Sequence, residues 1–578
     1  MARKRHSRED GYAIVMTTLA LFTSVLIAGL GFDYSIIYLI QTKLQGASDA
    51  AATAAVRALA QNPSMSNAQT VGQEFLTANF PAGFMGARLS FPGNYGSVTV
   101  SRINWSGGAG TAGSSAVAKL VQVSGIVIAP LYFLSVTGTT SVPISTSAQG
   151  KREGLLIMLV MDGSDSMLTV QTDGNTACLD AAQDAQAFLG YSQWDTDIDR
   201  IGLVAFGGQT YTVLPTNNFQ SSPGVVNTSN AVYTALTTYA SGSNGNEDAT
   251  VSSAVSAPTG CGGNTNTGGG LQAAYMAMEQ FYQTEASLGN TFSATTRNRA
   301  DIIVLMTDGA PNGFTANWTG NLTSGDSCVS TSTPALLVGY VTRHGVPPDP
   351  LRGILSTALN TGTNSTAAMG TPLGIPSKNC QWDPLNSGSP LAPNTAGLQN
   401  FYKDFTQYPS ATYYTDTVQG SSYGDTIIAN GTNSLIYPSV VQAYSTQGGQ
   451  LNAQGDDVQL YQFSCNSADA AATRLRSDPN FRVAIYSIGV GGNVTTDDYD
   501  YVNPMLLYRM ANTTGSCDAT CVSDFYKITG SNGLEPPSLS YTANPNQLQG
   551  DYIQVANATV LYQAFQQIAT EISARLSK

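Results

Sequence analysis

The hydrophobic positions of this chain fall into three patterns, and the first is an uninterrupted apolar run from Tyr12 to Phe32. It contains no charged residue and matches the roughly 20 residues that a helix needs to cross a bilayer. A cleaved signal peptide is the alternative, but its apolar core would span only about 7–15 residues, and no A-x-A site follows promptly. Basic residues precede the run: Arg3, Lys4, Arg5 and Arg8. Because such residues stay on the cytoplasmic side, we expect a single-pass inner-membrane protein whose N-terminus is cytoplasmic and whose bulk is periplasmic or extracellular.

The predicted helix continues beyond the apolar run, because apolar residues recur there at alternating spacings of three and four. They form a seam whose later part is all alanine: Ile37, Ile40, Leu44, Ala47, Ala51, Ala54 and Ala58. Small side chains let another element approach closely. The sequence leaves two partners open for this seam, the chain's own next domain or another helix of a bundle.

The second pattern is an alternation of apolar and polar residues between Ala87 and Gly150. It occurs in "SVTVSRINW", "LVQVSGIVIAP" and "TSVPISTSA", which are separated by Gly-rich turns. Alternation with period two is typical of half-buried strands. We therefore expect a small antiparallel β module here, without visible chemistry.

The third pattern consists of four continuously apolar runs, at residues 155–161, 201–207, 301–307 and 482–490. Parallel strands that are covered on both faces require such runs. Helical patterns lie between them, with Leu179, Ala182, Gln186 and Leu189 on one predicted face and Leu271, Ala274, Met278 and Phe281 on another. Alternating strands and helices predict an α/β fold with a doubly wound parallel sheet.

Composition narrows the class of function. Of the 578 residues only 11% are charged, against about 25% in an ordinary soluble domain, which is typical of exported proteins. The net charge is −13 and no basic run follows the first ten residues, so nucleic acid is not an expected partner. The two histidines exclude a His-rich zinc site. Seven cysteines in an exported chain favour disulfides, and we expect Cys517–Cys521 plus two bridges within a cap.

Oxygen-bearing side chains follow the predicted strands. Asp162, Ser164 and Ser166 come directly after the first, Asp308 follows another, and Thr265 lies in the loop "GNTNTGGGL" that opens a helix. In doubly wound sheets ligands bind at the carboxyl ends of the strands. Carboxylates and hydroxyls suit Mg²⁺ or Mn²⁺, and Ca²⁺ less well. Since only two of these ligands are anionic, we expect the ion to take one more carboxylate from a protein partner.

These residues resemble the von Willebrand factor type A domain and its metal-ion-dependent adhesion site, or MIDAS. The motif D-x-S-x-S corresponds to Asp162, Ser164 and Ser166, and "GNTNTGGGL" keeps the Gly-x-Thr-x-Thr spacing of the family. The resemblance implies that these three residues contact the metal directly or through water. It also implies that Thr265 and Asp308 complete the shell.

The N-terminal segment resembles the Tad (tight adherence) pilus-assembly proteins of the TadE/TadG type. In that family an apolar helix is followed by an Asp, a Leu-Gln pair and an Ala-rich stretch, which here are Asp33, Leu44–Gln45 and the run through Ala60. This similarity implies a bacterial protein involved in pilus assembly, anchored in the membrane by one transmembrane helix.

Five segments are expected along the chain. A cytoplasmic tip with the membrane helix and its Ala-rich extension (1–62) precedes a β-rich module (63–150); a first part of the α/β domain (151–310), an insertion or cap (311–465) and a second part of the same domain (466–578) follow. The insertion exceeds normal connections in a compact domain and leaves directly after Asp308. A second long loop, Pro215 to Gly262, is expected to join the cap.

The favoured function is binding rather than catalysis, in pilus assembly or cell adhesion, with the metal site contacting pilus or secretion components. Two alternatives stay open. A metal-dependent hydrolase in the capped cleft would need a general base, for which Asp165 and Asp173 are the spare carboxylates close by in sequence. In a structural subunit, the metal would only hold the chain's own loops, with an Asp or Glu of the same chain in its remaining ligand position.

Overall fold

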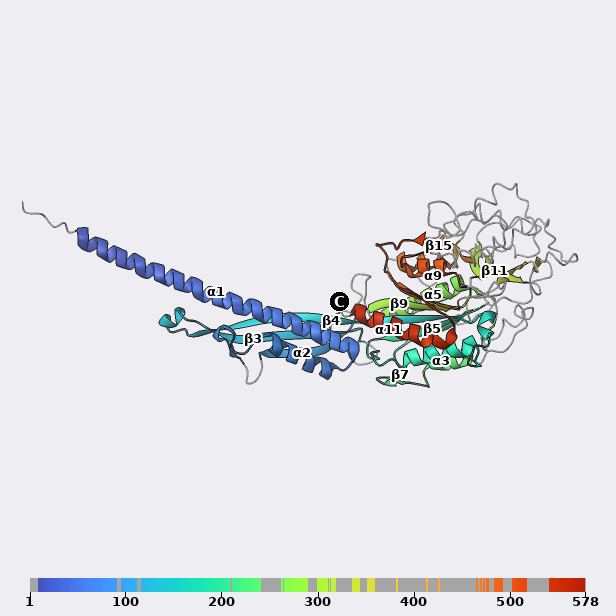
Figure 1. Cartoon of the computed structure of the whole chain (residues 1–578), viewed down its shortest axis with the longest axis horizontal. Helices are drawn as coiled ribbons and strands as arrows, with labels where there is room; N and C mark the ends of the chain where they lie inside the picture. The colour runs from blue at the N-terminus through green and yellow to red at the C-terminus, as the bar shows by residue number, and fades with distance from the viewer. Residues whose placement is uncertain are drawn as a thin grey trace, which may run out of the picture. The chain divides into compact units, whose positions relative to one another are not determined.

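The chain divides between Glu153 and Gly154 into two units in the computed structural model (Figure 1). The first comprises Met1–Glu153 with Ser573–Lys578, and the second comprises Gly154–Ile572. The structure describes residues 9–90, 95–105, 107–111, 116–207, 210–240, 261–262, 265–288, 299–309, 311, 313–318, 335–343, 351–358, 381–382, 412–413, 425–426, 464–465, 468–469, 471–473, 475–477, 483–491, 502–516 and 540–576.

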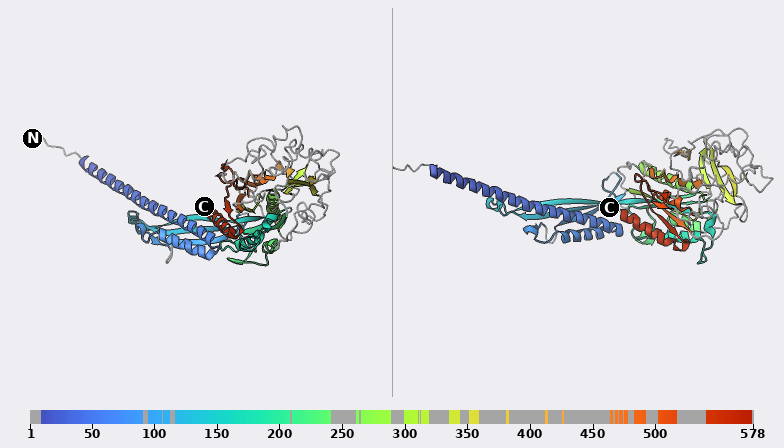
Figure 2. Two further views of the ribbon diagram at one scale, coloured as in Figure 1. Left: turned by 45° about the vertical axis from the view of Figure 1, so that its right-hand side comes forward. Right: turned by 45° about the horizontal axis from the view of Figure 1, so that its top comes forward.

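The first unit is built on one long helix, α1 (Glu9–Gln61). Its apolar first half is exposed and extends away from the rest of the unit (Figure 2), and within the described residues it is the one helix long and apolar enough to cross a membrane. The seam in its second half is buried from Ile40 onward, with Ile40, Leu44 and Ala51 fully covered, and Ile37 is partly buried. The seam packs on α2 (Met65–Asn79) and on the strands of the same unit, so the chain's own module is its partner.

The sheet of this unit is antiparallel, as the alternating pattern predicts. It contains β1 (Arg88–Leu89), β2 (Gly96–Ile103), β3 (Ala118–Pro130) and the first part of β4 (Ser141–Asp162), with the short helices η1 (Phe84–Gly86) and η2 (Leu134–Thr137). A methyl group on Gly125 would lie 2.8 Å from Ser48 Oγ, and one on Gly150 would lie 2.6 Å from Val56 Cγ2. Glycines on the sheet and small residues on α1 therefore let the helix lie very close to the strands.

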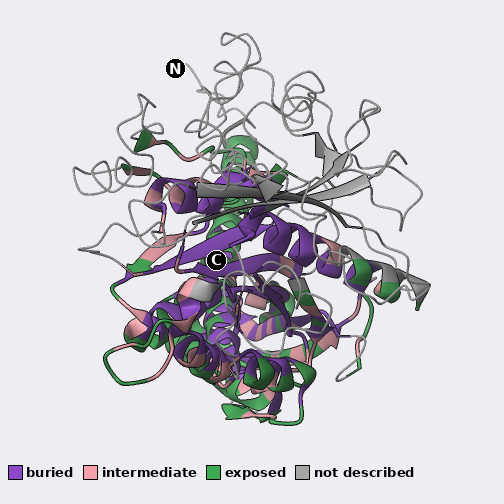
Figure 3. Ribbon diagram, turned by 90° about the vertical axis from the view of Figure 1, so that its right-hand side faces the viewer, coloured by how far each residue is buried: buried purple, intermediate pink, exposed green. Residues whose placement is uncertain are grey.

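The second unit contains the predicted parallel sheet, in the order β6-β5-β4-β9-β16-β19. These strands are β5 (Arg200–Phe206), β6 (Thr210–Thr216), β9 (Arg299–Thr307), β16 (Ala484–Val490), β19 (Tyr552–Val555) and the last part of β4. All neighbours are parallel except β5 and β6. The central strands are buried along almost their whole length (Figure 3), which explains their uninterrupted apolar runs and confirms the fold class.

The remaining elements of the second unit are helices and short strands. The helices are η3 (Asp165–Leu168), α3 (Ala177–Leu189), α4 (Ala231–Ala240), α5 (Thr267–Ser287), α9 (Pro504–Ala511), η5 (Ala558–Val560) and α11 (Leu561–Leu576). The short strands are β7 (Gln220–Ser222), β8 (Val225–Val226), β17 (Gly515–Ser516) and β18 (Ser540–Tyr541).

The predicted face of α5 is correct, and that of α3 is only partly correct, because Ala182 and Leu189 are buried as predicted. All four predicted residues of α5 are buried, whereas Leu179 and Gln186 of α3 are only half-buried. Besides Ala182 and Leu189, the buried stripe of α3 includes Cys178, Ala181, Ala185 and Phe188. Phe188 contacts Phe565 of α11, with ring centroids 5.4 Å apart. Many residues of this helix are small, so the pattern left its orientation ambiguous, and the contact with α11 decides it.

The described part of the segment between Pro215 and Gly262, residues 215–240 with 261 and 262, is not a bare loop. It contains the hairpin β7–β8 and helix α4, and α4 packs against α3 as a regular part of the α/β unit. The insertion after Asp308 contains a four-stranded antiparallel sheet, β10 (Gly313–Trp318), β11 (Ala335–Arg343), β12 (Leu351–Ala358) and β13 (Gln381–Trp382). It also contains the pair β14 (Thr412–Tyr413) and β15 (Asp425–Thr426). Most of the rest of the insertion lies outside the described residues.

Candidate metal centre

The two acidic residues of the sequence motif lie at the ends of neighbouring parallel strands. Asp162 is the last residue of β4, and Asp308 directly follows β9. These strands pair in register up to Met161 and Met306, so both carboxylates emerge at the same edge of the sheet. The chain turns immediately after Asp162 into the short helix η3, which brings Ser164 and Ser166 to this edge.

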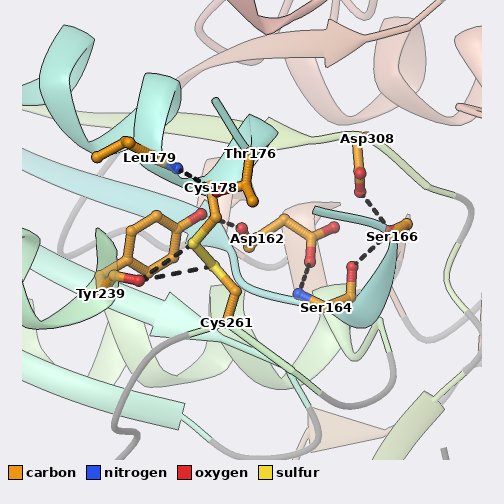
Figure 4. Close-up of a disulfide and its surroundings, with 9 residues drawn as sticks. All are labelled: Asp162, Ser164, Ser166, Thr176, Cys178, Leu179, Tyr239, Cys261 and Asp308. Carbon is orange, nitrogen blue, oxygen red and sulfur yellow. Dashed lines mark hydrogen bonds between the residues drawn. A yellow bond between two sulfur atoms is a disulfide. The ribbon is translucent and has the colours of Figure 1, made fainter. Parts of the chain in front are cut away.

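A chain of hydrogen bonds joins these side chains (Figure 4). The backbone N–H of Ser164 donates to Asp162 Oδ1 at 2.9 Å. The hydroxyls of Ser164 and Ser166 lie 2.9 Å apart, and Ser166 donates to Asp308 Oδ1 at 2.7 Å. Residues 142 positions apart in the sequence therefore share one polar cluster.

Thr265 lies beside the same cluster, as its distance from Gly309 shows. A methyl group on Gly309 would lie 3.4 Å from Thr265 Oγ1 and 3.8 Å from Ser166 Oγ. The carbonyl of Thr265 also accepts the N–H of Gly313 at 3.1 Å, which ties its loop to the start of β10. The structure thus brings together all five residues that the sequence singled out.

Asp162 is the buried centre of the site, with no exposed surface. Burial raises the pKa of its carboxyl to about 6, although hydrogen bonds from Thr307 and Ser164 oppose this by favouring the ionised form. The hydroxyl of Thr307, the last residue of β9, donates to Asp162 Oδ2. A buried carboxylate of this kind gains from a nearby cation, because a cation offsets the lost hydration.

Sequence reasoning missed two residues that support Asp162. Thr307 stands directly before Asp308 in "MTDG", and that adjacency was the available signal. Tyr239 comes from α4, where no local pattern marks it, and its buried hydroxyl donates to the backbone carbonyl of Asp162. Burial first, and then the charges of Asp162 and Asp308, raise the pKa of this phenol well above its usual range, so it stays a neutral donor.

A disulfide joins Cys178 at the start of α3 to Cys261, four residues before Thr265 (Figure 4). Both sulfurs lie against the backbone carbonyl of Tyr239, with Cys178 Sγ 3.1 Å from that oxygen. The sequence places both cysteines in or beside loops at the metal edge, but it does not predict this pairing, which joins α3 to the loop before Thr265 rather than lying within the cap. Cys517, Cys521, Cys328 and Cys380 lie outside the described residues.

The described residues fit a hard divalent ion. Oxygens that are adjacent ligands of an octahedral Mg²⁺, each about 2.1 Å from the ion, lie roughly 2.9 Å apart. The two oxygen pairs of this cluster, at 2.9 and 2.7 Å, already have that spacing. The buried hydroxyl of Thr267, next to the cluster in sequence, has no hydrogen-bond partner in the described part of the chain. Hydroxyl and carboxylate oxygens are hard ligands and bind soft metals weakly.

The hydrolase alternative needs a general base near the ion, for which the sequence offered Asp165 and Asp173. Asp173 is exposed, and its carboxylate accepts the N–H and the side-chain amide of Asn175 at 3.0 and 3.1 Å. The side chain of Asp165 lies outside the described part. Among the described residues, no group of three Asp, Glu, His or Cys side chains forms a metal cluster. Within the described residues, the site therefore consists of two carboxylates, those of Asp162 and Asp308, with hydroxyls around them.

Two family models match the chain. The von Willebrand factor type A domain matches residues 157–310, and the putative Flp pilus-assembly TadE/G-like family matches residues 11–58. The chain therefore carries a TadE/G-like N-terminal segment and a von Willebrand factor type A domain, as both resemblances in the sequence indicated. The predicted fold of the α/β unit is confirmed by this match and by the strand order.

Solved structures give looser similarities. The PilB minor pilin from Streptococcus sanguinis is 12% identical over 83% of this chain and 79% of that chain, with a TM-score of 0.29. The vWF domain of the type V pili tip protein Mfa5 from Porphyromonas gingivalis is 13% identical over 74% of this chain and 96% of that chain, also with a TM-score of 0.29. TM-scores this low indicate only a partial likeness. No curated protein matches the chain significantly.

Proposed function

We propose that this chain is a membrane-anchored, non-enzymatic Tad-type pilus-assembly or adhesion protein that binds a protein partner through a Mg²⁺- or Mn²⁺-dependent site. The observation that carries the proposal is the cluster of Asp162, Ser164, Ser166, Thr265 and Asp308 at one edge of the parallel sheet. These residues would hold the ion. The ion would supply a positive centre that a carboxylate of the partner can bind.

The charge of the cluster supports a binding role. Two carboxylates at most balance a divalent ion, and the hydroxyl ligands are neutral. An ion that keeps exchangeable water in such a shell is attracted to a further anionic oxygen. Asp308 and Ser166 are only half-buried, so solvent reaches the cluster on their side. Asp162 is fully buried, and the hydroxyls of Tyr239 and Thr307 donate hydrogen bonds to it.

The N-terminal segment supports the location. The TadE/G-like match covers residues 11–58, and α1 carries an exposed apolar half. We propose that this half spans the inner membrane once, with the basic N-terminus in the cytoplasm and the two units outside. Pilus or secretion components on that side are then the candidate partners.

The test is metal-dependent stabilisation of the purified full chain in lipid nanodiscs. Saturating Mg²⁺ or Mn²⁺ should raise the free energy of unfolding by about 2.7 kcal/mol at a hundredfold excess over Kd, measured by melting with EDTA and then with metal. Asp162→Asn should abolish this increase, and Asp308→Asn should reduce it. Asp173→Asn is the matched control, because it removes an exposed carboxylate eleven residues away and should leave the increase unchanged.

Two further outcomes separate the alternatives. Metal-dependent capture of pilus components by wild type but not by Asp162→Asn would support a binding role. Turnover of an ester or phosphoester substrate that requires Mn²⁺ and Asp162 would support the hydrolase instead. If the metal stabilises the chain but promotes neither capture of pilus components nor turnover of substrate, the ion is structural. The absence of any metal effect in the wild type would contradict the proposal altogether.

A further inference from the structure

The loop between β3 and β4, which we call the tip loop (Leu131–Gly138), exposes large apolar side chains beside the apolar half of α1. Tyr132 is 51% exposed, Phe133 47% and Val136 85%. The ring of Phe32, the last residue of the apolar run, lies edge-on to both aromatic residues, with centroids 6.3 and 5.6 Å away. These exposed side chains therefore continue the apolar surface of the proposed membrane helix.

Asp33 holds the tip loop in this position. Its carboxylate, which is 1% exposed, accepts the N–H groups of Tyr132, Phe133 and Leu134 at 2.8–3.2 Å. The bonds connect residues about a hundred positions apart, so the loop is attached to the first residue of α1 that follows the apolar run. Hydrogen bonds to a charged acceptor are among the stronger ones, particularly away from water.

Phe133 fixes how far the loop reaches along the helix. Its ring lies directly on Gly29, where an added methyl group would be 2.7 Å from the ring. Gly29 precedes Asp33 by four residues, which corresponds to about 6 Å along a helix. Phe133 therefore contacts α1 inside the apolar run. If that run lies in a bilayer, the ring must also lie below the level of Asp33.

The tip loop turns its polar groups inward. The hydroxyl of Ser135 donates to the carbonyl of Tyr132 at 2.6 Å, and that of Thr137 to the carbonyl of Leu134 at 2.7 Å. The N–H groups of Leu131, Val136 and Gly138 also bond within the loop and its base. Backbone groups in a membrane must be satisfied internally, and this loop meets much of that requirement.

The tip loop, the adjoining parts of its two flanking strands and the first part of α1 contain almost no charge. Residues 120–150 include no Asp, Glu, Lys, Arg or His, and between Gly11 and Thr42 of α1 the one charged residue is the buried Asp33. Exposed Tyr34 and Tyr38 follow on the helix. Aromatic residues of this kind are enriched where a membrane meets water, because they combine an apolar ring with a polar edge.

We propose that the tip loop is a second membrane contact: Tyr132, Phe133 and Val136 insert into the headgroup and upper acyl region of the leaflet from which α1 emerges. The inference rests on the proposed spanning of the membrane by α1 but not on the metal site. Two attachments, one spanning and one interfacial, would fix the depth of α1 and hold the first unit against the bilayer. The occupant of this apolar surface is lipid, because the surface is continuous with the spanning run.

The test uses tryptophan as a depth reporter in nanodiscs that contain brominated lipid. Phe133→Trp should be quenched, and more strongly by bromine near the headgroup end of the acyl chain than by bromine near the methyl end. Phe75→Trp is the matched control, because Phe75 on α2 has nearly the same exposure, 46%, and lies far from the tip loop in sequence. It should be quenched no more than the wild type with its four native tryptophans.

Phe22→Trp, in the middle of the apolar run, separates this inference from the proposed anchor. Quenching of Phe22→Trp without quenching of Phe133→Trp or Tyr132→Trp would overturn the tip-loop contact and leave the anchor intact. A lack of quenching at Phe22→Trp would overturn both. If Phe133→Trp is unquenched but its emission shifts only in discs that hold two chains, the surface binds a second copy and the lipid proposal is wrong.

Discussion

Removing the Cys178–Cys261 disulfide should destabilise the second unit strongly. Both cysteines are buried, and the bond closes a loop with a sequence separation of 83 residues. That loop contains two strands of the sheet, β5 and β6, and the helices α3 and α4, which pack against each other. The bond also precedes Thr265 by four residues and therefore restrains the loop that carries a candidate metal ligand.

The magnitude follows from the length of the loop. In the chain-entropy description, cross-linking a loop of this length removes about 15 cal/mol/K from the unfolded chain, or about 4.5 kcal/mol at room temperature. The double substitution costs the folded state little interaction energy, because the serine hydroxyl at position 178 would lie near the carbonyl of Tyr239 and donate a hydrogen bond to it. The predicted loss is a large fraction of the roughly 5–15 kcal/mol that stabilises an ordinary domain.

The assay is urea unfolding of the full chain in nanodiscs, comparing the wild type with the double variant Cys178→Ser/Cys261→Ser. The double variant leaves no unpaired thiol at the site. Reductant should lower the stability of the wild type more than that of the double variant, in which any remaining effect comes from the other cysteines of the chain. We also expect weaker binding of Mg²⁺ by the double variant, because the loop that positions Thr265 is then less restrained.

Equal unfolding free energies of the two proteins, within about 1 kcal/mol, would refute the reasoning from loop entropy. Mapping of non-reduced peptides provides the control. If Cys178 and Cys261 are joined and the stabilities still agree, the entropy argument is wrong. If they are not joined, the packing of α3 against α4 does not bring them together as described.

Two further predictions test burial and close packing in the same unit. Burial raises the pKa of half-buried Asp184 to about 6, so ionising this carboxyl costs the folded state free energy as the pH rises from about 4 to 6. In urea titrations, Asp184→Asn should therefore raise the unfolding free energy by roughly 1 kcal/mol above pH 6, after discounting for solvent screening. Below about pH 4, where the carboxyl is protonated in both states, the substitution should have no effect. Gly270→Ala should lower the unfolding free energy by about 1–3 kcal/mol in the same titration, because the added methyl group would lie 2.6 Å from the buried ring of Phe206. Gly46→Ala on α1 is the control: no atom lies near the added methyl group, so this substitution should be neutral or stabilising.

The candidate site illustrates how far local signals reach. Its five residues are identifiable from sequence, because parallel strands place their carboxyl ends at one edge and the polar residues directly follow apolar runs. The support of Asp162 by Tyr239 is not identifiable in that way. It depends on how α4 packs against α3, and nothing in the local pattern of "AVYTALTTYA" marks its tyrosine as a donor to the β4 strand.

The sequence by itself determined the continuous buried strands, the long N-terminal helix and the alternating module, because hydrophobic periodicity is a property of neighbouring residues. Tertiary structure alone decided which side of α3 is buried, that the alanine seam of α1 packs on its own module, and that Cys178 pairs with Cys261. It also decided that Asp33 binds the backbone of Tyr132, Phe133 and Leu134. Each of these depends on which distant segments meet, and the free energy of such contacts comes from shape and burial that no single stretch of the chain contains.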